Sequence, residues 1–220
     1  SEILGDTIEK GAREKAAIWR PGVPMLIRDP GVPEIRNAMR EEAISARFWN
    51  PEPGTVMDEA GDLAEVLCKM LGLEFVRRTP KWPARMQLIE SEPALLLDAA
   101  HNPSGMIRAI PEILKILPEK WSLLFGTSPQ ADMDSFLQPL FDLMSSHPPL
   151  EVITTEPQGG RYPGVVNPII GLDHISNPEL AIQSFTIDCD MILVIGSLYL
   201  CGNIIKFMGI DTDEDFNIVS

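Results

Sequence analysis

The second half of the chain alternates short, almost uninterrupted apolar runs with amphipathic stretches, and this alternation restricts the possible folds more than any other feature. The apolar runs are "ALLLDA", "WSLLFG", "LEVITT" and "MILVIG", and helix-type stretches such as "SGMIRAIPEILKIL" and "DMDSFLQPLFDLM" separate them. Apolar strands that alternate with helices are typical of a parallel sheet covered on both faces. The sequence therefore predicts an α/β fold with a mainly parallel, Rossmann-like sheet over residues 79–210.

Composition and charge exclude several classes of partner. The chain has 220 residues, 45% of them hydrophobic, and a net charge of −14. A chain of this length and hydrophobic content can bury a hydrophobic core. The negative net charge argues against binding to nucleic acid or to an anionic membrane. The longest apolar run, "MILVIGSLYLCGNII", is too short and too interrupted for a membrane span. Residues 211–220 form an acidic tail that we expect to be a solvated end.

The cysteines and the first residue bear on the cellular setting. Cys68, Cys189 and Cys201 are odd in number, far apart and in no CxxC pair, so neither a disulfide framework nor a zinc site is predicted. A reducing, cytoplasmic location fits this best. No signal peptide is visible, and because the chain opens with Ser1 rather than Met, we expect it to have been cut from something longer.

The first third of the chain has a different pattern, which predicts a separate domain over residues 1–78. "GDTIEKGAREKAAIW" predicts a helix from about Thr7 to Trp19 with Asp6 as its N-cap. A strand at "PMLIR" and a helix with Pro33 in its first turn are predicted next. Residues 48–57 are predicted to form a loop. "DEAGDLAEVLCKMLGL" predicts another helix, ended by Gly72. The basic connector "RRTPKW" then places a boundary near Thr79.

The stretch "LLLDAAHNP" places polar side chains at the carboxyl end of a predicted strand, which is where ligand binding collects in parallel sheets. A buried acid is costly without a partner, and this favours a functional Asp98 over a simple turn cap. For His101, a functional and a structural role are equally open. Asn102, before Pro103, could simply organise the turn. His147 and His174 lie in loop-like surroundings without a ligand set, and for them a structural role is the better interpretation.

Three stretches together resemble the folylpolyglutamate synthase and dihydrofolate synthase family of the Mur ligase superfamily. They are "LGDTIEKGAREKAAI", "WPARM…LLLDAAHNPSG" and "VIGSLYLCG", which match the family patterns LGDTIExIAxEKAGI, WPGRLE…LLDGAHNPxG and VxGSLYLxG. The resemblance implies an ATP- and magnesium-dependent ligase of the cytoplasm. Such an enzyme joins L-glutamate to dihydropteroate or folate through an acyl phosphate and is often a monomer.

The resemblance also implies roles for single residues. Lys15 matches a family lysine that becomes a carbamate and binds magnesium, a hard cation that prefers oxygen ligands. Arg85 and Asp98 match residues that contact ATP, and a guanidinium suits phosphate as a carboxylate suits ribose hydroxyls. His101 could reach a phosphate, a metal-bound water or a domain interface. Without the resemblance, Lys15 would be an exposed lysine on a charged helix face, and Arg85 a surface linker residue.

The chain also departs from the family pattern. It has no phosphate-binding loop of the form GxxxxGKS or GxxxxGKT, which in the family lies upstream of the region present here. Residues 1–78 would then be the C-terminal part of a central ATPase domain, and the missing N-terminal P-loop half would be a required partner. Ala84 replaces the glycine of the WPGR pattern, and "GTVMDEAGDLAEV" lacks the asparagine that contacts adenine in the family.

Two functional hypotheses therefore stay open. The chain is either the C-terminal portion of a folate-type glutamate ligase, inactive without the P-loop half, or a degenerate, non-catalytic relative that binds a nucleotide or a protein. A dinucleotide-dependent oxidoreductase is disfavoured because no GxGxxG follows a predicted strand.

Overall fold

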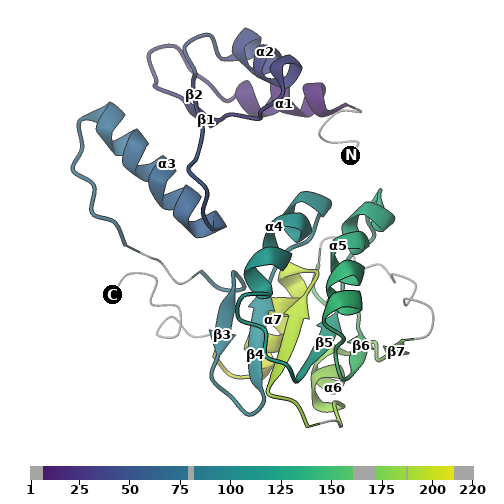
Figure 1. Cartoon of the computed structure of the whole chain (residues 1–220). Coiled ribbons are helices and arrows are strands. Elements are labelled where there is room, and N and C mark those ends of the chain that lie inside the picture. The colour runs from purple at the N-terminus through teal and green to yellow at the C-terminus, as the bar shows by residue number, and fades with distance from the viewer. Residues whose placement is uncertain (1–6, 79–81, 161–171, 187, 211–220) are drawn as a thin grey trace. The chain divides into compact units, whose positions relative to one another are not determined.

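The chain divides into two compact units, Ser1–Thr79 and Pro80–Ser220. The computed structural model describes residues 7–78, 82–160, 172–186 and 188–210 of them, and each unit has its own helices and strands (Figure 1). No helix in these four ranges is long and apolar enough to cross a membrane.

The first unit combines helices with a small parallel sheet. Its elements are α1 (Ile8–Ala16), β1 (Leu26–Arg28), α2 (Pro33–Glu42), β2 (Arg47–Trp49) and α3 (Val56–Leu71). Strands β1 and β2 pair in parallel, with Ile27 opposite Phe48. Helix α3 begins at a capping box between Thr55 and Asp58 and ends at Gly72, whose φ of 68° suits glycine. The predicted stop at Gly72 is thus confirmed.

Two sequence predictions for this unit were wrong in detail. Thr7, not Asp6, caps α1: its hydroxyl accepts the Lys10 N–H at 3.2 Å, and the helix ends at Ala16 rather than Trp19. A threonine hydroxyl reaches the third helical N–H as well as an aspartate does, so the adjacent pair left the cap ambiguous. Strand β2 overlaps the predicted loop over residues 48–57, because three residues are too few to give a periodic signal.

Helices α1 and α2 pack against each other through small side chains. Ala12 and Ala16 of α1 and Ala38 of α2 are almost fully buried. Alanine at a helix contact lets the two backbones approach closely, but each buries little apolar area. The contact is therefore close without forming a large core.

A buried carboxylate fastens the loop after β1 to α2. Asp29 accepts hydrogen bonds from the Arg36 Nε at 3.1 Å and from the Gly31 N–H at 2.9 Å, and it also pairs with the second guanidinium nitrogen of Arg36. Its side chain is only 4% exposed. The Arg36 hydrogen bond, and after it the Gly31 N–H, hold the pKa of Asp29 below its ordinary value of 3.8.

We expect Asp29→Asn to destabilise the protein in a pH-dependent way. A carboxyl with a lowered folded-state pKa stabilises the fold at pH values above about 4, and this contribution is lost as the pH falls through the lowered pKa. The difference in unfolding free energy between wild type and variant should therefore shrink on acidification. Urea unfolding followed by circular dichroism at several pH values measures it, and an equal difference at every pH would contradict the prediction.

The second unit is built on one six-stranded sheet. Its strands are β3 (Gln87–Ile89), β4 (Ala94–Asp98), β5 (Trp121–Phe125), β6 (Val152–Thr154), β7 (Asp173–His174) and β8 (Met191–Ile195), in the order β3-β4-β8-β5-β6-β7. Strand β3 runs antiparallel to β4, and all other neighbours are parallel. The predicted mainly parallel α/β fold is confirmed. Strand β7 was not predicted. Residues 161–171 before it and the tail 211–220 lie outside the described residues.

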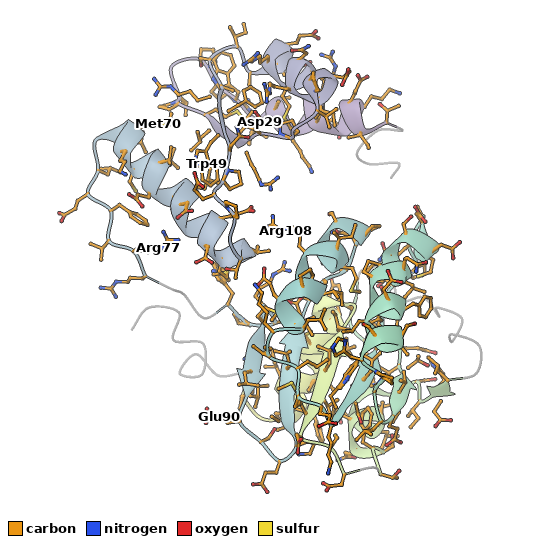
Figure 2. All side chains as sticks on the ribbon, viewed as in Figure 1. Asp29, Trp49, Met70, Arg77, Glu90 and Arg108 are labelled. Atoms are coloured by element: carbon orange, nitrogen blue, oxygen red, sulfur yellow. The ribbon has the colours of Figure 1, made fainter. Side chains whose placement is uncertain are left out.

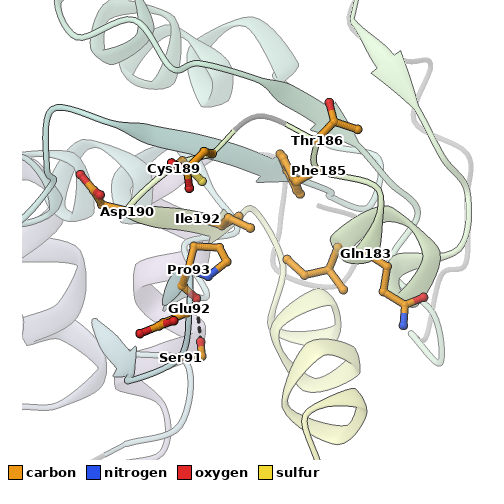
Figure 3. A pocket seen from close by; sticks show the side chains of 11 residues that line it. Ser91, Glu92, Pro93, Gln183, Phe185, Thr186, Cys189, Asp190 and Ile192 are labelled. Carbon is orange, nitrogen blue, oxygen red and sulfur yellow. Dashed lines mark hydrogen bonds between the residues drawn. The ribbon is translucent and has the colours of Figure 1, made fainter.

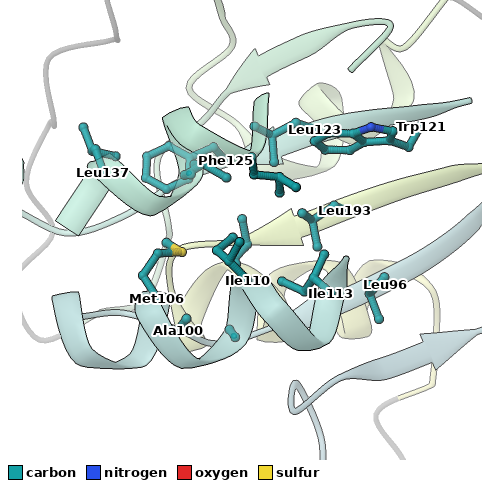
Figure 4. Close-up of a cluster of buried hydrophobic side chains, with 14 of the residues drawn as sticks. Leu96, Ala100, Met106, Ile110, Ile113, Trp121, Leu123, Phe125, Leu137 and Leu193 are labelled. Carbon is teal, nitrogen blue, oxygen red and sulfur yellow. The ribbon is translucent and has the colours of Figure 1, made fainter. Parts of the chain in front are cut away.

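Helices cover both faces of this sheet and give it two apolar layers. The helices are α4 (Pro103–Ile113), α5 (Met133–Ser146), α6 (Pro178–Gln183) and α7 (Leu198–Phe207). Leu96 of β4 packs in the layer with α4 and α5, whereas Leu95 and Leu97 pack in the layer with α6 and α7. Figure 4 shows the first layer, in which Leu123 and Leu193 lie beside Ile110 of α4. These layers hold the ends of the parallel strands in fixed positions.

Candidate functional site

Asp98 closes β4 and is held by the backbone on two sides. Its Oδ2 accepts the Met86 N–H at 3.1 Å and its Oδ1 accepts the Ala100 N–H at 2.9 Å. The residue is 5% exposed. Burial raises the pKa of Asp98 above its ordinary value, although the two N–H groups and the charge of Arg85 oppose this rise. The buried Asp98 carboxylate is thus stabilised in the first place by two backbone N–H groups.

The turn that carries Arg85 is fastened to the end of β4. The Ala99 N–H donates to the Ala84 carbonyl at 2.8 Å, in addition to the Met86 bond to Asp98. Ala84 and Met86 have positive φ values of 56° and 45°. Glycine is favoured in this region, and this gives a physical reason for the glycine of the WPGR pattern where this chain has Ala84. The constrained turn leaves Arg85 exposed beside Asp98.

His101 and Asn102 lie in the turn between β4 and α4. The His101 Nδ1 lies 2.8 Å from the Ala99 carbonyl, so Nδ1 carries the proton and Nε2 is left as the second nitrogen of an exposed ring. The Asn102 Oδ1 accepts the Gly105 N–H at 2.8 Å and caps α4. Asn102 therefore organises the turn, which is one of the roles expected for it.

The neighbouring strands end at the same level as β4. Ile195 of β8 lies opposite both Asp98 and Phe125 of β5. Gly196 and Gly126 follow, and a Cβ added to Gly196 would lie 2.7 Å from the Gly126 carbonyl oxygen. Gly196 thus permits a close approach of the backbones at the ends of β5 and β8. Four polar residues at or just beyond the ends of β5, β6 and β8 are buried: Thr127, Thr154, Thr155 and Ser197.

Sequence reasoning missed Gln130 as a residue that organises this edge. Its Nε2 donates to the His101 carbonyl at 3.0 Å and so ties the loop after β5 to the turn after β4. It lies in "GTSPQADMD", a loop between a strand and a helix, and a glutamine in such a loop gives no signal of which carbonyl it will reach. Cys201 of α7 is also near: burial, and after it the charge of Asp98, raise the pKa of its thiol, and this disfavours the thiolate form that acts as a nucleophile.

Lys15 lies in the other unit. It occupies the last turn of α1 and is exposed, whereas Arg85, Asp98 and His101 come together at the carboxyl edge of the second unit. No group of three or more His, Cys, Asp or Glu side chains among the described residues could hold a metal ion.

A hollow of about 780 Å³ lies at the opposite edge of the sheet. Pro93 before β4 and Asp190 before β8 line it, together with Cys189 and Phe185 (Figure 3). It contains none of the predicted site residues. The chemistry expected from the sequence thus belongs to the carboxyl edge and not to this hollow. His147 caps the end of α5. His174 was expected in loop-like surroundings, but it is the last residue of β7 at the carboxyl edge, where it bonds to Thr154 and Glu156.

No protein-family model and no curated protein sequence match this chain. Solved structures do: the α/β fold is that of the C-terminal part of folylpolyglutamate synthase structures. The folylpolyglutamate synthase of Thermotoga maritima is 20% identical with a TM-score of 0.64, and the match covers 96% of this chain and 60% of that one.

Two further solved structures match this chain to a similar extent. The folylpolyglutamate synthase/dihydrofolate synthase of Yersinia pestis, solved with AMPPNP and a Mn ion, is 20% identical with a TM-score of 0.69. The E. coli FolC protein, solved with DHPP and ADP, is 20% identical with a TM-score of 0.71. Each match covers 94% of this chain and 58% of the other. This chain thus spans about three fifths of the length of these proteins.

Proposed function

We propose that this chain is the carboxy-terminal portion of an ATP-dependent ligase that adds L-glutamate to dihydropteroate or folate. One observation carries the proposal: the "WPARM" and "LLLDAAHNP" stretches are bonded to each other at the carboxyl edge of the sheet, through Met86 to Asp98 and through Ala99 to Ala84. Ligands bind at the carboxyl ends of the strands in sheets of this kind, and both stretches that carry the family resemblance lie together at that edge. The small-molecule partners would be ATP, L-glutamate and the pterin substrate.

The residues of this edge suit part of a nucleotide site. ATP, when bound with magnesium, supplies the phosphoryl group that activates a carboxylate for attack by an amine. Arg85 is exposed, and its guanidinium can donate to phosphate oxygens. Each oxygen of Asp98 uses one lone pair on a backbone N–H and keeps another for a ribose hydroxyl. The neutral His101 ring can accept a hydrogen bond at Nε2, because its proton on Nδ1 is donated to the Ala99 carbonyl.

The domain roles follow from the same proposal. Residues 1–78 would complete a central ATPase domain and residues 79–210 would form the C-terminal domain. The part that binds the phosphates would come from the amino-terminal part of the ligase fold, which the matches leave uncovered. We call this chain combined with that part the joined protein. A cytoplasmic location is also proposed, because Cys68, Cys189 and Cys201 are all free thiols.

A degenerate, non-catalytic relative is the second candidate. Ala84 stands in a positive-φ position where the family pattern has glycine, and "GTVMDEAGDLAEV" lacks the expected asparagine. Such a protein would keep the fold and bind a nucleotide or another protein without ligation. Titration calorimetry with ATP separates the candidates: we expect weak binding to this chain alone and tighter binding to the joined protein. Tight binding by the chain alone would favour the second candidate.

Lys15 is proposed to become a carbamate that binds magnesium in the joined protein. Carbamylation turns the amine into an oxygen donor of the kind magnesium prefers. In bicarbonate and magnesium, mass spectrometry of the intact joined protein should detect the added carbon dioxide, and Lys15→Arg should abolish it and lower ligation. Lys10→Arg on the same helix is the matched control and should keep both. An unmodified Lys15 in an active, metal-loaded joined protein would contradict this role.

A further inference from the structure

The hollow of about 780 Å³ lies where β4 and β8 begin, at the amino edge of the sheet, and its inner wall is apolar. Ile182 of α6 and Ile192 of β8 line it, are 9% and 2% exposed, and belong to the apolar layer with α6 and α7. Pro93 and Phe185 extend this wall and are half-buried. The volume is far more than one water molecule fills. The hollow therefore suits an organic molecule with an apolar body.

Hydrogen bonds within the chain hold the walls of the hollow in place. The Ala94 N–H donates to the Asp190 carbonyl at 3.1 Å and so joins the loop before β4 to the segment before β8. The Thr186 N–H donates to the Glu151 carboxylate at 3.0 Å, which ties the segment after α6 to the residue before β6. Figure 3 shows the side chains of these segments around one space. Because the walls are already fastened, a ligand need not order them on binding.

Three carboxylates surround the hollow without a cation to balance them. Glu92, Asp188 and Asp190 are exposed lining residues, and none of them pairs with a Lys, Arg or His side chain among the described residues. Lys120 contacts this segment through its backbone carbonyl, which accepts the Asp190 N–H at 2.8 Å. The net charge of −14 attracts cations to the whole chain. The local charge of the hollow thus complements a positively charged ligand.

Buried polar groups beside the inner wall also lack partners. Cys189 lines the hollow and is 8% exposed, and its thiol has no hydrogen-bond partner among the described residues. Ser122 of β5 lies opposite Ile192 and on the same face of the sheet, because Leu124 two residues later packs in the layer with α6 and α7. The Ser122 hydroxyl is buried and equally unpartnered within the described part of the chain. Buried polar groups are normally satisfied, so these two indicate that the chain alone does not complete this site.

A single metal ion is not the cation that these carboxylates suit. No three His, Cys, Asp or Glu side chains in the described ranges lie close enough to hold a metal ion together. A ligand that pairs with more than one of Glu92, Asp188 and Asp190 must therefore carry its positive charges apart from each other. Methylene groups between those charges would cover the apolar wall and remove it from water. A linear aliphatic polyamine has both properties.

We propose that this hollow binds a linear aliphatic polyamine. Its ammonium groups donate hydrogen bonds to the carboxylates of Glu92, Asp188 and Asp190, and its methylene chain lies on the apolar wall. The inference is independent of the proposed function, because neither Arg85 nor Asp98 lines the hollow. It assigns to the amino edge a ligand site separate from the one proposed at the carboxyl edge.

Titration calorimetry of the whole chain with spermidine at low salt tests this site. We expect saturable one-to-one binding, tighter than the binding of butylamine, which has a single ammonium group. The double variant Glu92→Gln, Asp190→Asn should raise the Kd for spermidine by about three- to tenfold, because exposed ion pairs are lost. The double variant Glu90→Gln, Glu179→Gln is the control, since it changes the net charge equally at exposed residues outside the hollow; Glu90 is labelled in Figure 2. The control should leave the Kd almost unchanged.

Other results would overturn the site. If spermidine does not bind saturably, or if both double variants weaken it equally, the negative net charge attracts it without a site. Butylamine that binds as tightly as spermidine would contradict the need for separated charges. A trilysine peptide that binds where spermidine does not would mean that the hollow takes a basic peptide instead. Both double variants should keep the wild-type circular dichroism spectrum, and Asp188→Asn, at the third carboxylate, should also weaken spermidine binding.

Discussion

Replacing Gly196 with alanine is expected to destabilise the second unit by about 3–5 kcal/mol. Gly196 has a φ of 113°, a conformation that residues with a side chain rarely adopt. The new Cβ would also lie 2.7 Å from the Gly126 carbonyl oxygen and 2.7 Å from the ring of Phe125, which is buried in the core. Because neither neighbour can move freely, backbone strain and steric overlap add. Urea unfolding of the whole chain, followed by tryptophan fluorescence, measures the loss.

Gly202 provides the matched control in the adjoining helix. It lies inside α7, and a Cβ there would meet nothing within 4 Å. Gly202→Ala should therefore stabilise the protein by about 0.5–1 kcal/mol, since alanine loses less entropy in a helix. A Gly196→Ala variant that unfolds like wild type would mean that β5 and β8 do not approach as closely as the structure has them, and that this edge of the sheet is free to widen.

Replacing Asp98 with alanine should lower kcat/KM for ATP in the joined protein by roughly 10- to 150-fold, which corresponds to about 1.5–3 kcal/mol. The carboxylate is proposed to bind the nucleotide, and it also holds the Met86 N–H and hence the turn that presents Arg85. The variant also leaves two backbone N–H groups without their acceptor, at about 1–3 kcal/mol each. Its unfolding must therefore be measured beside its ATP kinetics.

Arg85→Ala separates the two effects of Asp98. Arg85 is exposed, so its loss should change the unfolding free energy by no more than about 0.5 kcal/mol. If the guanidinium binds phosphate, ATP use by the joined protein should still fall, and Arg85→Lys should restore part of it. Unchanged ATP use in both Asp98→Ala and Arg85→Ala would mean that these residues only shape the turn.

Much of the fold of the second unit could be predicted because its signals are long and local. The apolar runs of β4, β5 and β8 have five residues each, and the helices between them show clear amphipathic periodicity. Strands β2 and β7 escaped prediction because they have only three and two residues and exist through pairing with distant segments. Local sequence carries almost no information about such pairs.

The candidate site could be predicted in its residue types but not in its bonds. The position of Asp98 at a strand end follows from the sequence, whereas its two backbone donors come from a turn twelve residues upstream and from the next loop. Ala84 illustrates the same limit: only the glycine of the family pattern signals the positive φ there. Pairings across the chain, such as Gln130 with His101, depend on the tertiary structure and leave no local pattern.

The central claim is that this chain is the carboxy-terminal portion of a glutamate ligase, and the incorporation of labelled L-glutamate tests it most directly. The joined protein is incubated with ATP, magnesium, labelled glutamate and either dihydropteroate or folate, and the products are separated by chromatography. The account predicts a labelled product that requires ATP and both parts of the protein, with neither part active alone. A folded joined protein that binds ATP but never incorporates glutamate into either substrate would contradict it.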